Sequence, residues 1–273
     1  METFQLSEKL LKKIANLILA KKNTPLKKIV KDIHFADMAE IINELNEDQG
    51  VYLIKLFDSE KTSEILTELD EDVREKILKV LSVKEIADEI EELDSDDAAD
   101  ILGELSEKRK EEVISEISDN DLADDLKELL SYKEDSAGGL MAKELVQANE
   151  NWSVTKCLNE IKKQGENVTR VHSIYVVDDK QKLIGRLSLK DLITSPAKNL
   201  IKDIYIPKVD SVNVFEDGEE VAKIMSKYDL EAIPVVDNKK QLVGRITIDD
   251  IIDFIKEEAE EDYLLAAGVQ GDV

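Results

Sequence analysis

A spacing of twelve residues between apolar positions constrains the first half of this chain more than any other feature. The fragments NELNED (43–48) and TELDED (67–72) show that the pattern also repeats every 24 residues. The apolar positions of the twelve-residue series are Leu45, Phe57, Leu69, Leu81, Leu93, Leu105, Ile117 and Leu129. A fixed period of this kind indicates a stack of short structural units.

A residue that favours helix starts follows seven of these apolar positions. Its side chain can accept hydrogen bonds from the free backbone N–H groups of the next helix. The seven are Asn46, Asp58, Asp70, Ser82, Asp94, Ser106 and Ser118. Ser82 and Glu85 have the spacing of a capping box. Because helices of about two turns are unstable alone, the pattern predicts that they pack side by side in a helical solenoid.

A single long coiled coil is the alternative for this half of the chain. No proline lies between Pro25 and Pro196, so nothing would interrupt such a helix. However, a coiled coil needs apolar residues in a heptad pattern, and twelve is not a multiple of seven. The recurring caps therefore favour the solenoid.

The second half contains a duplicated unit after the glycine-containing segment SYKEDSAGGLM (131–141). The two copies carry SIYVVDDKQKLIGRLSLKDLI (173–193) and AIPVVDNKKQLVGRITIDDII (232–252). Each reads as a strand, a polar turn, a second strand and a helix that opens at Ser188 or Thr247. An amphipathic helix is expected before each copy, over 153–164 and 218–229.

This duplication resembles a tandem pair of cystathionine-β-synthase (CBS) domains, which usually dimerise. The motifs GRLSLKD (185–191) and GRITIDD (244–250) fit the element with which that family can bind adenine nucleotides such as ATP. The resemblance implies a nucleotide site at Ser188, Lys190, Asp191 and Thr247. Helix capping by Ser188 and Thr247 explains the same residues equally well.

An acidic solenoid followed by tandem CBS domains resembles the cytoplasmic region of the MgtE magnesium channel family. The segments LDSDDAADIL (93–102), DSAGGLM (135–141) and VGRITIDDIIDFIKEEAEED (243–262) carry the resemblance. MAKE (141–144) departs from the family pattern at a place to which no role is assigned.

The expected fold is α plus α/β. Its parts are an N-terminal helix (1–24), the solenoid (25–131), a linker (132–141), CBS domain 1 (142–200), CBS domain 2 (201–256) and the start of a connecting helix toward a membrane domain (257–273).

Carboxylates recur at helical spacing near the end of the chain. Asp249, Asp253, Glu257 and Glu261 follow one another at i+4, and Glu258 pairs with Asp262 in the same way. Like charges at this spacing destabilise a helix unless something neutralises them. Magnesium prefers such oxygen ligands and keeps several of its waters. The apolar stripe of this helix is expected at Ile251, Ile252, Ile255 and Ala259.

The family resemblance implies which residues bind several magnesium ions per subunit. These are Asp96, Asp100, Gly139, Asp217, Glu219, Asp229, Asp250, Asp253, Glu258, Glu261 and Asp262. The repeat leaves an alternative alignment of the solenoid pair onto Asp94 or Asp97. Bridging ions between the solenoid and the CBS domains would then favour a compact, closed-channel state.

Composition excludes several other classes of protein. The formal charge of −25 opposes binding to nucleic acids and anionic lipids. One cysteine, Cys157, and two histidines exclude a disulfide and a cysteine or histidine metal cluster, and Cys157 is expected to be a packing residue. No stretch has the length of a membrane span, which favours a soluble, intracellular segment at the cytoplasmic face of the membrane.

Three functions remain, none of them enzymatic, because no nucleophile with a partnered base and no phosphate-binding glycine loop is found. The first is a magnesium sensor that regulates a channel, acting as a homodimer through its CBS domains and attached to its own transmembrane domain. The second is an adenine-nucleotide sensor. The third is a solenoid scaffold that binds another protein, for which sodium at matched ionic strength would replace magnesium.

Overall fold

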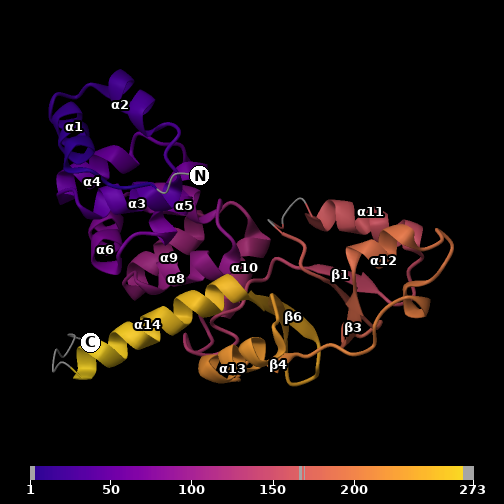
Figure 1. The fold of residues 1–273 in the computed structure, drawn as a ribbon. Coiled ribbons are helices and arrows are strands. Elements are labelled where there is room, and N and C mark those ends of the chain that lie inside the picture. Colours follow the sequence, from indigo (N-terminus) through magenta and orange to yellow (C-terminus); the bar gives the residue numbers. More distant parts are fainter. Residues whose placement is uncertain (1–3, 166–167, 169, 267–273) are drawn as a thin grey trace. The chain divides into compact units, whose positions relative to one another are not determined.

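The computed structural model describes residues 4–165, 168 and 170–266 (Figure 1). The chain forms two compact units. The first contains residues 1–93 and 97–124, and the second contains residues 94–96 and 125–273. Each unit is described by itself below.

Short helices make up the first unit, as the repeat predicts. The helices of this part of the chain are α1 (Glu8–Leu19), α2 (Asn23–Val30), α3 (Phe35–Asn43), α4 (Glu47–Ile54), α5 (Ser59–Thr67), α6 (Glu71–Val80), α7 (Val83–Ile90), α8 (Ser95–Gly103), α9 (Glu107–Glu116) and α10 (Asn120–Leu129). From α3 onward each helix has only eight to ten residues, so its stability depends on its neighbours.

Side-chain caps start several of these helices where the spacing places them. Asn46 and Ser82 form capping boxes with Gln49 and Glu85, which confirms the predicted Ser82 box. The prediction for Ser118 is wrong by one residue. Asp119 accepts hydrogen bonds from the first turn of α10, because Ser118 is occupied by the carboxylate of Glu91.

The period of 24 residues corresponds to a pair of helices. Helices α3, α5, α7 and α9 contact one another in succession, and α4 contacts α6. Cationic side chains tie these layers together at helix carboxyl ends, where backbone carbonyls lack partners. Lys61 donates to the carbonyls of Val30 and Ile33, and Arg109 donates to that of Leu78.

Two three-stranded sheets form the second unit. The first has the order β1 (Val146–Asn149), β2 (Ile174–Val177), β3 (Leu183–Leu187), and the second has the order β4 (Val212–Asn213), β5 (Ala232–Val236), β6 (Leu242–Thr247). In each sheet the first pair is parallel and the second antiparallel. The accompanying helices are α11 (Val154–Gln164), α12 (Leu189–Thr194), the 3-10 helix η2 (Ile201–Asp203), α13 (Gly218–Tyr228) and α14 (Ile248–Ala266).

The two sheets meet through their hairpin turns in a pseudo-symmetric way. The amide of Leu183 donates to the carbonyl of Lys240 at 3.0 Å, and the amide of Leu242 donates to that of Gln181 at 3.0 Å. Gln181 and Lys240 both have positive φ, at 62° and 65°. The sequence duplication is therefore also a duplication of backbone conformation, as expected for a pair of CBS units.

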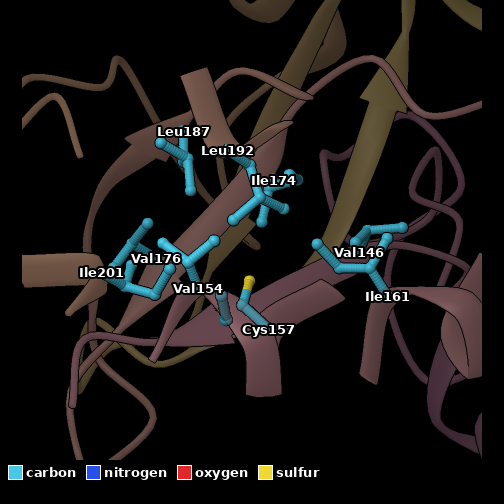
Figure 2. Close-up of a cluster of buried hydrophobic side chains, with 10 residues drawn as sticks. Val146, Val154, Cys157, Ile161, Ile174, Val176, Leu187, Leu192 and Ile201 are labelled. Carbon is cyan, nitrogen blue, oxygen red and sulfur yellow. The ribbon is translucent and has the colours of Figure 1, made fainter. Parts of the chain in front are cut away.

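Aliphatic side chains form the core of the first β–α unit (Figure 2). Cys157, on α11, lies fully buried among Val154, Ile174 and Val176. Burial raises the pKa of the Cys157 thiol to about 11, so the group stays protonated and acts as a small apolar side chain. This agrees with the packing role expected from the sequence.

The predicted apolar stripe of the last helix is partly wrong. Ile251 is buried and Phe254 is 8% exposed, whereas Ile252 and Ile255 are about half exposed and Ala259 is exposed. The helix turns the i, i+3 positions 251 and 254 toward its core, and the other isoleucines lie on a different face. Each helix in the described part of the chain is either too short or too polar to span a membrane.

Candidate acidic ion-binding site

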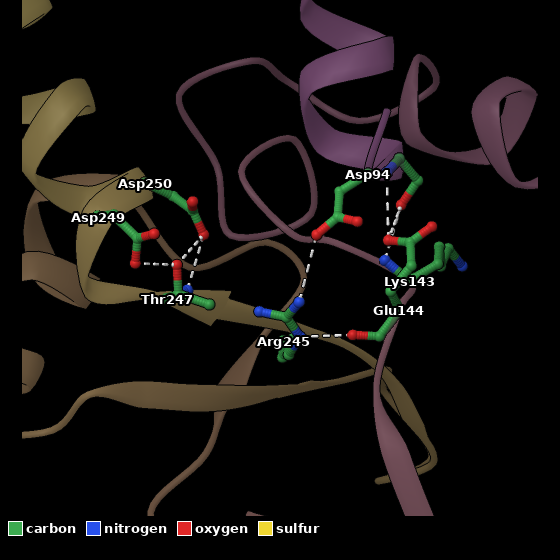
Figure 3. A network of polar contacts seen from close by, with 8 residues as sticks. Asp94, Lys143, Glu144, Arg245, Thr247, Asp249 and Asp250 are labelled. Atoms are coloured by element: carbon green, nitrogen blue, oxygen red, sulfur yellow. Dashed lines mark hydrogen bonds and ion pairs between the residues drawn. The ribbon is translucent and has the colours of Figure 1, made fainter. Parts of the chain in front are cut away.

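A short segment pairs with the last strand of the second sheet and begins the site. The amide of Ala142 donates to the carbonyl of Arg245 at 2.8 Å, and the amide of Arg245 donates back at 2.9 Å. Two residues later, the carbonyl of Glu144 accepts a hydrogen bond from Nε of Arg245 (Figure 3). Arg245 is only 6% exposed, so its guanidinium is held in place by these partners.

The side chain of Glu144 organises the start of helix α8. Its Oε2 accepts hydrogen bonds from the amide of Ser95 at 3.1 Å and from the hydroxyl at 2.8 Å. The Ser95 hydroxyl in turn accepts one from the amide of Lys143 at 2.8 Å. Ser95 is fully buried, and a carboxylate at the amino end of a helix is favoured by the helix dipole.

Three carboxylates come together around this serine. Oxygen atoms of Asp94, Asp96 and Glu144 lie within 4.8 Å of one another. All three residues are partly exposed, so water can reach them. A set of oxygen donors that leaves room for water fits Mg²⁺, which is usually held by one or two carboxylates and retains bound waters.

Arg245 is a resident cation beside these carboxylates. Its guanidinium lies 3.5 Å from Oδ2 of Asp94, an ion pair longer than a good hydrogen bond. A divalent cation would add positive charge beside these three carboxylates and the single guanidinium.

Two further carboxylates share one hydroxyl at the start of α14. Oγ1 of Thr247 lies 2.6 Å from Asp249 and 2.7 Å from Asp250 (Figure 3). Burial raises the pKa of Asp250, and the charge of Asp249 adds to this. Burial also acts to raise the pKa of Asp249, but the hydrogen bond from the Thr247 hydroxyl and the electrostatic effect of nearby groups, Arg245 among them, lower it overall.

The shared hydroxyl limits how the two carboxylates can be protonated. The Thr247 hydroxyl has one proton and cannot donate to both carboxylates. The opposite pKa shifts mean that Asp250 holds a proton more strongly than Asp249 does. Binding of a cation here would favour the ionised form of both groups.

The remaining acidic residues expected in the second CBS unit have local structural roles. Asp217 caps α13 by accepting from the amide of Glu219 at 3.0 Å. Glu219 pairs with Lys223 at 3.1 Å, and Asp253 pairs with Lys256 at 2.6 Å. Asp229 ends α13 in the left-handed conformation, with φ of 51°. These residues do not belong to the carboxylate cluster found here.

The other expected ligands lie on α8, at the junction and on α14. Asp100 follows Asp96 by one turn of α8, and Glu258 is on α14. The side chains of Glu261 and Asp262 lie outside the described residues. The amide of Gly139 donates to the carbonyl of Ser136 at 2.9 Å, and a Cβ on Gly139 would collide with the backbone of Lys133 and Glu134. Glycine is thus required there by close backbone approach.

The residues expected to bind a nucleotide form a helix cap. The Ser188 hydroxyl donates to Asp191 at 2.7 Å and accepts from its amide at 3.0 Å. Lys190 is exposed. A separate cavity lies beside His172, Tyr175 and Arg245, but its volume of about 10 Å³ holds no more than one water.

Glu144 and Arg245 are the members of this site that sequence reasoning missed, and Asp94 was expected only as an alternative to Asp96. Glu144 lies in the MAKE segment, to which no role was assigned. The available signal was the position of this carboxylate, five residues after Gly139 at the junction.

Family models match both units. The MgtE intracellular N domain matches residues 33–135, and the CBS domain matches residues 137–198 and 201–257. The magnesium transporter MgtE of Thermus thermophilus is 42% identical over 131 residues, which is 48% of this chain and 29% of the relative. That of Enterococcus faecalis is 40% identical over 140 residues, which is 51% of this chain and 31% of the relative. These alignments thus span less than a third of the relatives' length.

Solved structures match over most of the chain. One is the crystal structure of the cytosolic domain of the Mg²⁺ channel MgtE in complex with ATP, with 30% identity and a TM-score of 0.82 over 89% of this chain and 99% of that one. Another is the soluble part of a magnesium transporter, with 29% identity and a TM-score of 0.78 over 92% of this chain and 99% of that one. The chain therefore belongs to the MgtE family of magnesium transporters, in the part that comprises the family's N domain and CBS domains.

Proposed function

We propose that this chain is the cytosolic, non-catalytic regulatory region of a magnesium channel and that it senses Mg²⁺ through its acidic residues. The observation that carries the proposal is the group of Asp94, Asp96 and Glu144, whose oxygens lie within 4.8 Å of one another. The buried Ser95 and Arg245 hold this group in place before any ion binds. The names of the relatives, which are magnesium transporters, support the same ion.

The proposed mechanism is electrostatic. The ion-free protein has a formal charge of −25, and its acidic surfaces repel one another. Mg²⁺ bound at carboxylates lowers this repulsion and so favours a compact state of the chain, which we associate with a closed channel. Asp250, Asp253 and the expected acidic residues of α14 extend the same response to further ions.

We propose a homodimer as the working form. Leu189 and Ile193 on α12 are 44% and 63% exposed, and Ile252 and Ile255 on α14 are 46% and 49% exposed. Exposed apolar side chains on these two helices favour association. Attachment to a transmembrane domain is part of the proposal, and it is supported by the relatives, which are named as magnesium transporters.

An adenine nucleotide is the second candidate ligand, and it is compatible with the first. A relative of this chain was solved with ATP. Tyr175 in this chain is 2% exposed, its hydroxyl has no hydrogen-bond partner among the described residues, and cationic Arg245 lies beside it. Because the adjoining cavity is so small, nucleotide binding requires the two CBS units to open there.

The test is a titration of MgCl₂ against thermal unfolding and small-angle scattering, with NaCl at matched ionic strength. Mg²⁺ at ten times its Kd should stabilise the protein by about 1.4 kcal/mol and reduce its radius of gyration. The double variant Asp96→Asn/Glu144→Gln should lose most of the gain in stability. The control Glu64→Gln/Glu111→Gln removes two exposed carboxylates of the solenoid. It should keep the gain in stability on addition of Mg²⁺.

An equal response to sodium would show that the carboxylates are only a solvated surface, and the scaffold function would then be favoured. An equal loss in the control would show that total charge matters and that the cluster does not.

A further inference from the structure

The amino-terminal helices reverse the charge of the chain. Residues 7–31 contain eight lysines and one acidic residue, Glu8, whereas the rest of the chain has 29 basic against 61 acidic residues. The match to the MgtE N domain begins only at residue 33. The basic segment therefore lies outside both family models, and the acidic sensor does not account for it.

These lysines are displayed on a folded surface. Helix α1 buries Ile14 and Ile18 and packs against α2 and α4. Its opposite face carries the lysines, and α2 and the turn before it add more. All of them are exposed: Lys9, Lys12, Lys13, Lys21, Lys22, Lys27, Lys28 and Lys31.

An open hollow of about 720 Å³ lies along this face. Lys9, Lys12, Lys13 and Lys22 line it together with Leu17 and Ala20. Leu19, at the end of α1, is 72% exposed. Within the described part of the chain, the ion pair recorded for these lysines joins Lys12 to Glu8 at 2.8 Å, and both side chains are more than 70% exposed. The surface thus offers cationic heads and an apolar edge.

The chemistry of this surface fits a plane of anionic headgroups better than a nucleic acid. Residues 7–31 contain no arginine for bidentate phosphate binding and no aromatic residue on which a base could stack. Lysine stems and the exposed Leu19 instead suit the boundary between headgroups and acyl chains.

The net charge of −25 opposes binding to anionic lipids, but the position of this surface keeps the acidic helices at the other end of the first unit away from the membrane. In Figure 1, α1 and α2 lie at the end of the first unit opposite α8 and α9. At physiological salt, charges are screened beyond about 8 Å. A flat anionic surface that contacts α1 and α2 therefore does not experience the acidic helices at the other end of this unit.

We propose that residues 7–31 form a docking surface for an anionic lipid membrane. The proposal does not depend on magnesium sensing, because it uses no acidic residue and no metal. It would hold the amino-terminal end of the solenoid near a membrane by electrostatic attraction, with Leu17 and Leu19 at the headgroup level.

Vesicle co-sedimentation tests this proposal with the full chain in EDTA, which prevents divalent ions from bridging carboxylates to lipids. Binding to vesicles of phosphatidylcholine and phosphatidylglycerol should exceed binding to phosphatidylcholine alone and should fall as NaCl rises. Each lysine near such a surface contributes about a fivefold increase in affinity. The variant Lys9/Lys12/Lys13/Lys22→Gln should therefore bind at least about tenfold more weakly.

The matched control replaces four exposed lysines elsewhere in the solenoid, Lys76/Lys79/Lys84/Lys108→Gln, and should bind as the wild type does. Circular dichroism of both variants checks that the helices persist. Equal weakening in the control, or no preference for phosphatidylglycerol, would overturn the proposal. So would lysine-dependent binding to inorganic polyphosphate or duplex DNA without binding to vesicles, since the partner would then be a soluble polyanion.

Discussion

The two β–α units have nearly the same backbone but very different surroundings at one equivalent arginine. In the first β–α unit, Arg186 exchanges backbone hydrogen bonds with Ile206 at 3.0 and 2.8 Å, and its side chain is exposed. In the second β–α unit, Arg245 exchanges the same backbone hydrogen bonds with Ala142, and its side chain is buried. The segment that flanks the arginine therefore differs, although the arginine motif does not.

This difference shows how a duplicated unit acquires a specific site. The segment at Ala142 continues to Glu144, which fixes Ser95 and brings Asp94 and Asp96 to the arginine. In the part of the chain that the structure describes, no such carboxylate group adjoins Arg186. The scaffold is common to both units, and the flanking segment supplies the chemistry.

Removal of the buried arginine should give the largest contrast between the units. Arg245→Gln removes the guanidinium that contacts Asp94 and the Glu144 carbonyl and should lower the free energy of unfolding by about 3 kcal/mol in EDTA. Arg186→Gln, at the exposed position, should change it by less than about 0.5 kcal/mol. Urea denaturation measures both.

The same variant also tests the acidic site. Without the resident guanidinium, the carboxylates attract Mg²⁺ more strongly, so the stabilisation by Mg²⁺ should be larger in Arg245→Gln than in the wild type. An unchanged magnesium response would show that the ion binds elsewhere.

The glycines before the two arginines should give a smaller contrast. A Cβ on Gly185 would collide with the carbonyl of Ile206 and the ring of Tyr205. A Cβ on Gly244 would meet Sδ of Met141 at 2.6 Å and the carbonyl of Ala142 at 2.9 Å. Gly185→Ala should cost about 3 kcal/mol and Gly244→Ala about 1.5 kcal/mol, because the added Cβ comes closer to the backbone carbonyl of Ile206 than to that of Ala142, and the end of Met141 can move. Thermal unfolding that reverses this order would contradict the assigned packing.

Replacement of the aspartate near the start of α14 or α12 by asparagine should change stability least, and with opposite signs in the two β–α units. The pKa of Asp250 is raised, chiefly by burial, so the folded state holds this proton more strongly than the unfolded state does. The resulting stability is fully present below the ordinary pKa of 3.8 and is lost as pH rises through the raised value. At neutral pH without Mg²⁺, Asp250→Asn should therefore stabilise the protein, because the amide side chain has no charge to be buried.

Asp191→Asn, at the equivalent cap, should instead destabilise the protein by about 0.5 kcal/mol, since it removes a charge from the start of α12. Unfolding in EDTA from acid to neutral pH distinguishes the two variants. A gain for Asp250→Asn that grows with pH supports the assignment, and a loss at all pH values contradicts it.

The fold was more predictable from sequence than the site. The spacing of twelve residues encodes cap and core positions locally, so helices such as α7 begin where the capping box indicates. The CBS hairpins likewise follow from apolar runs that flank polar turns. The Ser118 prediction failed because the partner of this serine, Glu91, is 27 residues away in the sequence.

The site depends on such distant pairings throughout. Glu144 meets Ser95 across 49 positions of sequence, and its carbonyl meets Arg245 across 101. The spacing of acidic residues cannot reveal either contact. Family resemblance placed Asp96 among the predicted ligands, and the structure brings it to Asp94 and Glu144. Asp217 caps α13 and Asp253 pairs with Lys256, contacts that only the folded structure shows.

The lone cysteine has a practical consequence. Cys157 lies at the centre of the first β–α unit, and a thiol with a pKa near 11 reacts very slowly with alkylating reagents at neutral pH. Modification therefore requires this core to open. The rate of alkylation therefore measures how often the first β–α unit opens, and it does so without an engineered label.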